Sequence, residues 1–160
     1  LVGFARRDWA DQDFGKIVLL SIIQEVVDKE LKPNRLADET VEKILDTYHP
    51  MVGSMVGEKW SLPVQVIAAM AYHRSLSAKG DSLLYAAIAN LSDLLVLRIG
   101  KFTDEEIANL TPEDMEVQVM AAELADAPAN RVLGLSVDQL AGILARAQEC
   151  MQSAKELMRP

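Results

Sequence analysis

Two histidines are the side chains of this sequence best suited to do chemistry. His49 and His73 are the only imidazoles in the 160 residues, and they bracket the stretch HPMVGSMVGEKWSLPVQVIAAMAYHR. Imidazole can bind a divalent metal or exchange a proton near neutral pH. Each also has a structural alternative. His73 shares an apolar helix face with Val66 and Met70, where a hydrogen-bonded core histidine is common, and His49 could close a helix C-terminus.

Two carboxylates are candidates to share a site with the histidines. Asp93 stands in the middle of LLYAAIANLSDLLVLRIG, which is otherwise mostly apolar. A buried carboxylate needs a cation, a metal or a proton, although Asp93 could also face solvent or bond to a neighbouring helix. Asp13 precedes Gly15 and Lys16 at the start of an apolar segment. An acid, a flexible glycine and a lysine in that order could position a metal and a phosphate.

The elements that must position these residues are helices. Apolar residues recur with helical spacing along most of the chain, and no segment alternates with period two long enough to predict a strand. We expect helices over residues 16–30, 38–49, 50–60, 62–72, 83–99 and 137–158. Pro50 is expected to end or bend the first of these helices at His49, because the residue before proline avoids the αR conformation, and it can instead lie in the first turn of a new helix to Trp60. Three capping boxes are predicted at Thr103 with Glu106, Thr111 with Asp114, and Ser136 with Gln139.

The apolar patterning predicts where these helices are buried. Segments 62–72 and 83–99 are apolar on almost every side, which predicts buried helices. We expect Trp60 to be a buried anchor beside the turn at Leu62. Gly53 and Gly57 are four residues apart, a spacing that lets another helix approach closely. We expect segment 126–131 to be a loop and the weakest connection within the domain. We therefore predict an all-α fold, a single compact domain of orthogonally packed helices spanning residues 1–160.

Composition excludes several classes of protein. Half of the residues are apolar, a quarter are charged, and the formal net charge is −8. This balance argues against binding of nucleic acid or of an anionic membrane surface. The longest apolar stretch is interrupted by Asn90, Ser92 and Asp93, so we expect no membrane span. One cysteine and no signal peptide indicate the cytoplasm. Because the chain starts at Leu1, we expect it to be the C-terminal portion of a longer chain.

Several sequence blocks, taken together, resemble the HDOD domain, a bacterial relative of the HD metal-dependent phosphohydrolases. The blocks occur in the family's order over about residues 10 to 150. They are QDFGKIVLL at 12–20, His49-x-x-x-Gly53, Trp60-x-Leu62-Pro63, Tyr72-His73-Arg74, Leu91-Ser92-Asp93 and LGLSVDQLAGIL near the C-terminus.

This resemblance implies an HD-like metal site in which some of the expected ligands are replaced. In active HD enzymes, histidines and aspartates from several helices hold one or two divalent metals that activate water. The resemblance therefore implies Asp13, His49, His73 and Asp93 as ligands of manganese, iron or magnesium. Gln12 stands where the first residue of the His-Asp pair belongs, however, and an amide is a poor ligand. Arg74 stands where a second histidine often occurs.

Three functions remain open at this stage. The first is a signalling or regulatory HDOD module with a degenerate metal site and no catalytic residues. It would act by binding a nucleotide, a protein partner or an attached receiver or output domain, and it could form a homodimer. The second is an active metal-dependent phosphohydrolase or phosphodiesterase. The third is a helical interaction domain without a small-molecule ligand. In the first reading, Asp93 is expected to lie near His73 and Arg74, so that the arginine replaces the charge of the metal.

Overall fold

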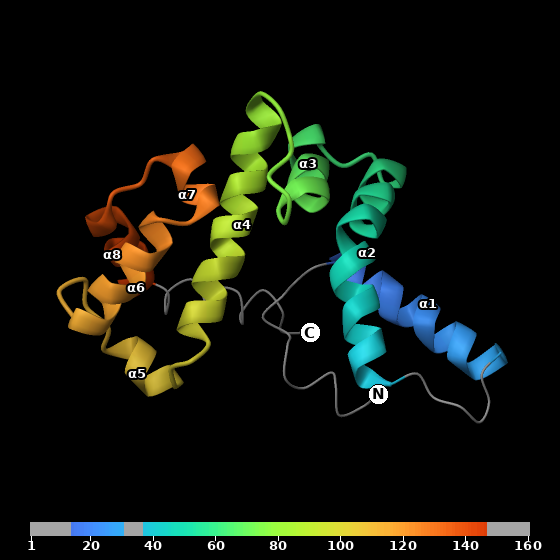
Figure 1. Cartoon of the computed structure of the whole chain (residues 1–160), viewed down its shortest axis with the longest axis horizontal. Helices are drawn as coiled ribbons and strands as arrows, with labels where there is room; N and C mark the ends of the chain where they lie inside the picture. The colour runs from blue at the N-terminus through green and yellow to red at the C-terminus, as the bar shows by residue number, and fades with distance from the viewer. Residues whose placement is uncertain (1–13, 31–36, 147–160) are drawn as a thin grey trace. The chain divides into compact units, whose positions relative to one another are not determined.

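The regular structure is helical throughout the residues that the computed structural model describes, 14–30 and 37–146 (Figure 1). The predicted all-α fold is thus confirmed. The helices are α1 (Phe14–Glu30), α2 (Asp38–Lys59), α3 (Val64–Tyr72), α4 (Asp81–Ile99), α5 (Asp104–Ala108), α6 (Met115–Ala125), α7 (Pro128–Leu133) and α8 (Val137–Ala145). The predicted continuous helix over 137–158 is wrong at Ala145, where α8 ends with Arg146 as its C-cap, and residues 147–158 lie outside the described ranges.

The chain divides into two compact units, residues 1–89 and 90–160, and α4 contributes to both. The first unit contains α1, α2 and α3, with α2 in contact with both of the others (Figure 1). The second contains α5 to α8, in which α6 packs mainly on α8. The expected single domain over residues 1–160 stays a prediction.

Helix α2 organises the first unit through one stripe of buried residues. The stripe takes every fourth residue and consists of Val41, Leu45, His49, Gly53 and Gly57. A repeat of four follows one ridge of an α-helix, because four residues advance slightly more than one turn. The stripe changes from large aliphatic side chains through an imidazole to glycine, so neighbouring helices can come closer towards its C-terminal end.

Helix α1 packs on the N-terminal end of this stripe, where the side chains are large, and contacts the part with small residues through one glycine. Leu19 and Ile23 of α1 form a buried cluster with Val41 and Leu45 of α2. At Gly15, an added Cβ would lie 2.9 Å from the carbonyl carbon of His49 and 3.0 Å from the nitrogen of Gly53. The two backbones are therefore in contact at this point, and only glycine fits.

Helix α3 packs on the C-terminal end of the stripe. A Cβ at Gly57 would lie 3.2 Å from Ile67 and 3.3 Å from the sulfur of Met70. The predicted role as a close-approach position is confirmed for Gly57, whereas a Cβ at Gly53 would make only ordinary contacts of 3.6 Å, with Gly15 of α1 and Met70 of α3. The expectation that segment 62–72 is buried on all sides is wrong, since Ala68 is the only buried residue of α3. Apolar composition alone does not distinguish a helix packed on one side from a helix packed on all sides.

Pro50 does not end α2, which contradicts an end of the helix at His49 and a new helix from Pro50. The helix runs through the proline from Asp38 to Lys59. Proline removes one backbone hydrogen bond of the helix, at a cost of about 3 kcal/mol. Buried residues before and after Pro50, from Val41 to Gly57, offset this cost, because a break would separate the part packed on α1 from the part packed on α3. His49 is consequently an interior residue of a helix and not its C-terminal cap.

Trp60 is not the buried anchor that the sequence predicts, since 57% of its surface is exposed. The reason lies in the end of α2. Ser61 has a positive φ of 54°, and Leu62 donates its N–H to the oxygen of Gly57, while Ser61 donates to Glu58. This pair of bonds is a Schellman motif, which places the hydrophobic residue after the left-handed one against the helix. Leu62 therefore packs on Gly57, at 3.7 Å from a Cβ placed there.

The second unit is built around α6 and α8. Their buried residues are Val117, Met120, Ala121, Leu124, Leu140, Ala141 and Leu144. The capping boxes predicted at Thr103 and Ser136 are both formed. The one at Thr111 is formed only in part. Asp114 accepts a hydrogen bond from the backbone N–H of Thr111 at 2.7 Å, but α6 begins later, with Asp114 itself as N-cap.

The expected loop over residues 126–131 is wrong, because α7 (Pro128–Leu133) occupies most of this segment. Asn130 is buried within it. Its amide donates to the oxygens of Ala125 and Leu135, at 3.1 and 2.9 Å, and accepts from the Leu135 N–H at 3.0 Å. One side chain thus holds both ends of the connection between α6 and α8.

Helix α4 has the length and composition of a membrane span, with a mean hydropathy of 1.5 over its most apolar window and 28% of that window buried. The core helix of a soluble protein passes the same test, so this observation is weak evidence. It also shows that Asn90, Ser92 and Asp93 do not make the segment too polar for such a test. The expected absence of a membrane partner stays a prediction.

Candidate functional site

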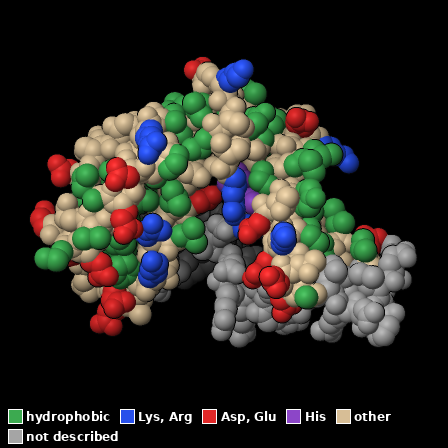
Figure 2. Space-filling model, in the orientation of Figure 1, with side chains coloured by type: hydrophobic (Ala, Val, Ile, Leu, Met, Phe, Trp, Pro, Cys, Tyr) green, Lys and Arg blue, Asp and Glu red, His purple; other side chains and the backbone are tan. Residues whose placement is uncertain are grey.

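The two histidines, 24 residues apart in sequence, are in direct contact inside the first unit. Their Nε2 atoms are 3.1 Å apart, and their ring centroids are 5.2 Å apart with the planes tilted by 48°. His49 is completely buried and His73 is 5% exposed. Figure 2 accordingly shows very little histidine surface. The sequence-based pairing of His49 and His73 therefore corresponds to a contact in the structure.

Backbone carbonyls fix the orientation of both rings. Nδ1 of His49 lies 2.7 Å from the oxygen of Leu45. Nδ1 of His73 lies 3.2 Å from the oxygen of Ala69 and 3.1 Å from that of Met70. A carbonyl oxygen can only accept, so each Nδ1 must carry the proton and donate it. In the neutral form of each ring, Nε2 then carries a lone pair.

A positive charge between the rings would satisfy both Nε2 atoms of this arrangement. Two neutral imidazoles with protonated Nδ1 atoms would direct two lone pairs at each other across 3.1 Å. A proton on one Nε2 converts the contact into an imidazolium–imidazole hydrogen bond. A metal ion would also satisfy both atoms. With metal–nitrogen bonds of about 2.1 Å, two ligands at an angle of about 95° lie about 3.1 Å apart.

The described residues supply two of the ligands that a metal would need. No group of three or more His, Cys, Asp or Glu side chains with suitable positions occurs in the described ranges. Asp13 and Gln12 lie outside those ranges, so their positions are not part of the described site. A structural or catalytic ion normally takes at least three protein ligands. The histidine pair alone does not fit that requirement.

Three further residues belong to the predicted site or adjoin it in the sequence. Asp93 is half-buried in the part of α4 that belongs to the second unit, so its expected contact with His73 and Arg74 stays a prediction. Lys16 is half-buried in the first turn of α1. Arg74 forms an ion pair with Asp46 of α2 at 3.4 Å, and both side chains are largely exposed.

Asp46 was not among the residues selected from the sequence. It lies three positions before His49 on α2, and Arg74 directly follows His73, so the ion pair joins the same two segments as the histidine contact. Asp46 could have been selected from the sequence, because an acid shortly before His49 and a base directly after His73 can form an ion pair once the two histidines are in contact. An exposed pair of this kind contributes little stability, about 0–1 kcal/mol. It can nevertheless keep the end of α3 in register with α2.

Comparison with known families gives one match. Residues 12–76 match the family model of the HDOD domain, and this segment contains α1, α2 and α3 with both histidines. The resemblance inferred from the sequence is thus confirmed for the segment, which covers less than half of the chain. The later blocks, at Asp93 and near the C-terminus, lie beyond it. No curated protein and no solved structure gave a significant match.

Proposed function

We propose that this chain is a non-catalytic regulatory module of the HDOD type, which acts by binding a protein or a small ligand such as a nucleotide. The observation that carries the proposal is the buried contact between the Nε2 atoms of His49 and His73 at 3.1 Å. In this proposal a shared proton, and not a metal ion, bridges the two nitrogens. The pair then acts as a buried polar clamp between α2 and the end of α3.

Two observations support a clamp over a catalytic centre. A hydrolytic metal keeps an open position for water, whereas the two histidines are 0% and 5% exposed. In the sequence, Gln12 replaces the metal-binding histidine that the resemblance would place beside Asp13.

A chelator tests the proposal. Under the clamp model, EDTA leaves the melting temperature unchanged, and protein purified without chelator contains no stoichiometric manganese, iron or magnesium. Added manganese also gives no hydrolysis of cyclic dinucleotides or of generic phosphodiesters. The His73→Gln variant is the control, because it removes one of the two facing nitrogens.

A site that binds a metal ion would give the opposite dependence of the melting temperature on chelator and metal. An ion at 100 times its Kd stabilises the native state by about 2.7 kcal/mol, which for a chain of this size corresponds to about 5–10 °C. EDTA would lower the melting temperature by that amount, manganese or iron would restore it, and His73→Gln would be insensitive to both. This result would overturn the clamp model.

One observation favours the alternative, a metal-dependent phosphohydrolase of the HD superfamily. The separation of 3.1 Å suits two neighbouring ligands of one ion as well as it suits a hydrogen bond. Asp13 would then have to supply a further ligand. Metal-dependent turnover that is abolished by Asp13→Ala would establish this alternative.

A further inference from the structure

Helix α2 carries a second row of large apolar side chains, which is exposed. Tyr48, Met51 and Met55 are 48%, 54% and 61% exposed. Their spacing of three and four residues places them on one side of the helix, as in the seam between two packed helices. Figure 2 shows hydrophobic side chains gathered along α2. We call these three side chains the apolar face of α2, and a surface of this kind is typical of an interaction site.

A polar row borders the apolar face on one side. It consists of Lys43, Thr47, Ser54 and Glu58, whose spacing of four, seven and four residues aligns them along the helix. The hydroxyls of Thr47 and Ser54 donate to the backbone oxygens of Lys43 and Met51, at 2.7 and 2.9 Å. The middle of the row can therefore be covered by another helix without leaving a hydroxyl donor unsatisfied.

The two charges of the polar row stand at its ends. Lys43 and Glu58 are exposed, and their side chains make no hydrogen bond or ion pair within the described ranges. They are 15 residues apart in the sequence, about 22 Å along the helix, and Met51 lies near the midpoint. A second α2 in antiparallel orientation would place its Glu58 beside Lys43 and its Lys43 beside Glu58. A parallel orientation would place like charges together.

We propose that the apolar face of α2 binds the same face of a second copy of this chain, with the two helices antiparallel and Met51 near the two-fold axis. A two-fold axis brings the same surface of both copies together. The polar row is complementary to itself under the reversal that this axis produces, and this symmetry favours a second copy over an unrelated partner. Flexible methionine side chains can adapt to each other across the axis.

The expected dimer is weak and exchanges rapidly with the monomer. A standard stable interface buries about 800 Å² on each partner, which is more than three half-exposed side chains provide. The net charge of −8 opposes the association only in part, because charges more than about 8 Å apart are largely screened at physiological salt. The proposal does not depend on whether a proton or a metal ion bridges the two histidines.

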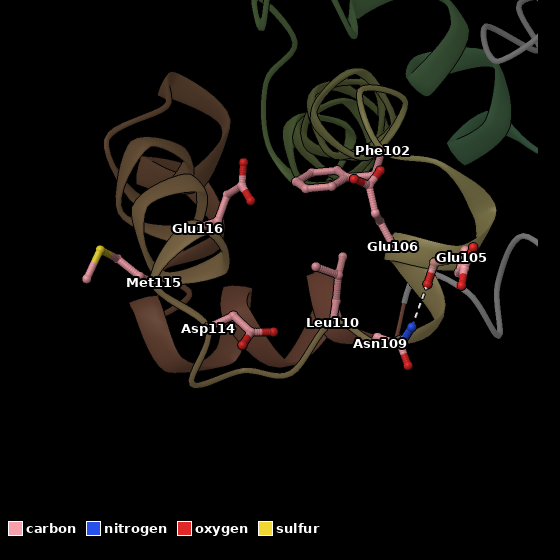
Figure 3. Close-up of a pocket in the computed structure, with 8 residues that line it drawn as sticks. All are labelled: Phe102, Glu105, Glu106, Asn109, Leu110, Asp114, Met115 and Glu116. Atoms are coloured by element: carbon pink, nitrogen blue, oxygen red, sulfur yellow. Dashed lines mark hydrogen bonds between the residues drawn. The ribbon is translucent and has the colours of Figure 1, made fainter.

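Sedimentation velocity of the full chain, over a series of protein concentrations up to the millimolar range, measures the association. We expect a concentration-dependent shift from monomer to dimer. Met51→Glu should abolish this shift, because two carboxylates would face each other near the axis. Met115→Glu is the matched control. Met115 is 83% exposed on α6, and Figure 3 shows it pointing away from the hollow between Phe102 and Leu110. The same substitution there should leave the association unchanged.

Exchange of the two charges tests the antiparallel orientation. Lys43→Glu and Glu58→Lys should each raise the dissociation constant about four- to twenty-five-fold, because each removes two exposed ion pairs that contribute a factor of about two to five apiece. The double variant should restore the affinity, since both pairs form with reversed sign. A monomer at every concentration, equal effects of Met51→Glu and Met115→Glu, or a double variant as weak as the single ones would each overturn the proposal. Thermal melts of each variant confirm that it is folded.

Discussion

Replacing Gly15 with alanine tests the close contact between α1 and α2. The new Cβ would overlap the carbonyl oxygen of His49 and would lie 2.9 Å from the carbonyl carbon of His49 and 3.0 Å from the nitrogen of Gly53, all of which are backbone atoms that cannot rotate away. The helices must therefore separate by on the order of 1 Å, which is the scale of overpacking that costs about 3 kcal/mol. The helix propensity of alanine returns at most about 1 kcal/mol. We expect a net loss of about 2 kcal/mol.

Two other glycines provide matched controls for Gly15→Ala. A Cβ at Gly53 would meet its nearest neighbours at 3.6 Å, an ordinary contact, and one at Gly142 in α8 would meet nothing within 4 Å. Gly53→Ala should be neutral or slightly stabilising, and Gly142→Ala should stabilise by about 0.5–1 kcal/mol. The free energy of unfolding is measured by urea denaturation followed by circular dichroism. If Gly15→Ala is as stable as Gly53→Ala, the inferred backbone contact is wrong.

Three further predictions concern other parts of the molecule. Trp60→Ala should change the free energy of unfolding by less than about 1 kcal/mol in urea denaturation, because the side chain is 57% exposed; a loss of 3 kcal/mol or more would show that it is buried. Asn130→Ala should cost about 3 kcal/mol in the same assay, since buried backbone groups lose their partners, and an unchanged midpoint would contradict this. The pKa of Glu106 is lowered from 4.5 by bonds from the Thr103 backbone N–H and then its hydroxyl. A lowered folded-state pKa means that the ionised carboxylate stabilises the protein above about pH 4.5, and that this contribution is lost as the pH falls through the folded-state pKa. An NMR titration of Glu106 should therefore give a midpoint below 4.5 that moves upward in Thr103→Val, and a midpoint at or above 4.5 would refute the capping interaction.

The sequence predicted the features that depend on periodicity and on short-range chemistry. Helical spacing gave the all-α fold, and two of the three capping boxes formed as expected because their bonds involve residues only three apart. The pairing of the histidines came from a resemblance to a family and not from spacing. Nothing local to His49 or His73 indicates that their Nε2 atoms lie 3.1 Å apart.

The sequence failed where tertiary packing overrides a local preference. Pro50 predicts that the helix ends or bends at His49, but it does not end there, because burial on both sides of Pro50 keeps α2 continuous. Trp60 looks like a core residue by size, but the left-handed Ser61 turns the chain so that Leu62 takes the inner position. Serine is a rare residue at that place, and so no sequence signal marked the turn. The burial of Asn130 was missed for a similar reason, since its partners are backbone groups.

The stripe of every fourth residue along α2 also limits how this helix can change in length. One residue inserted between Leu45 and Gly53 would rotate everything beyond it by about 100°. Either His49 or Gly57 would then leave the buried side, and the contact with α1 or with α3 would be lost. Substitutions at exposed positions such as Met55 leave the stripe intact. Helix α2 should thus accept many changes of side chain but no insertion or deletion of a single residue, whereas a loop would tolerate both.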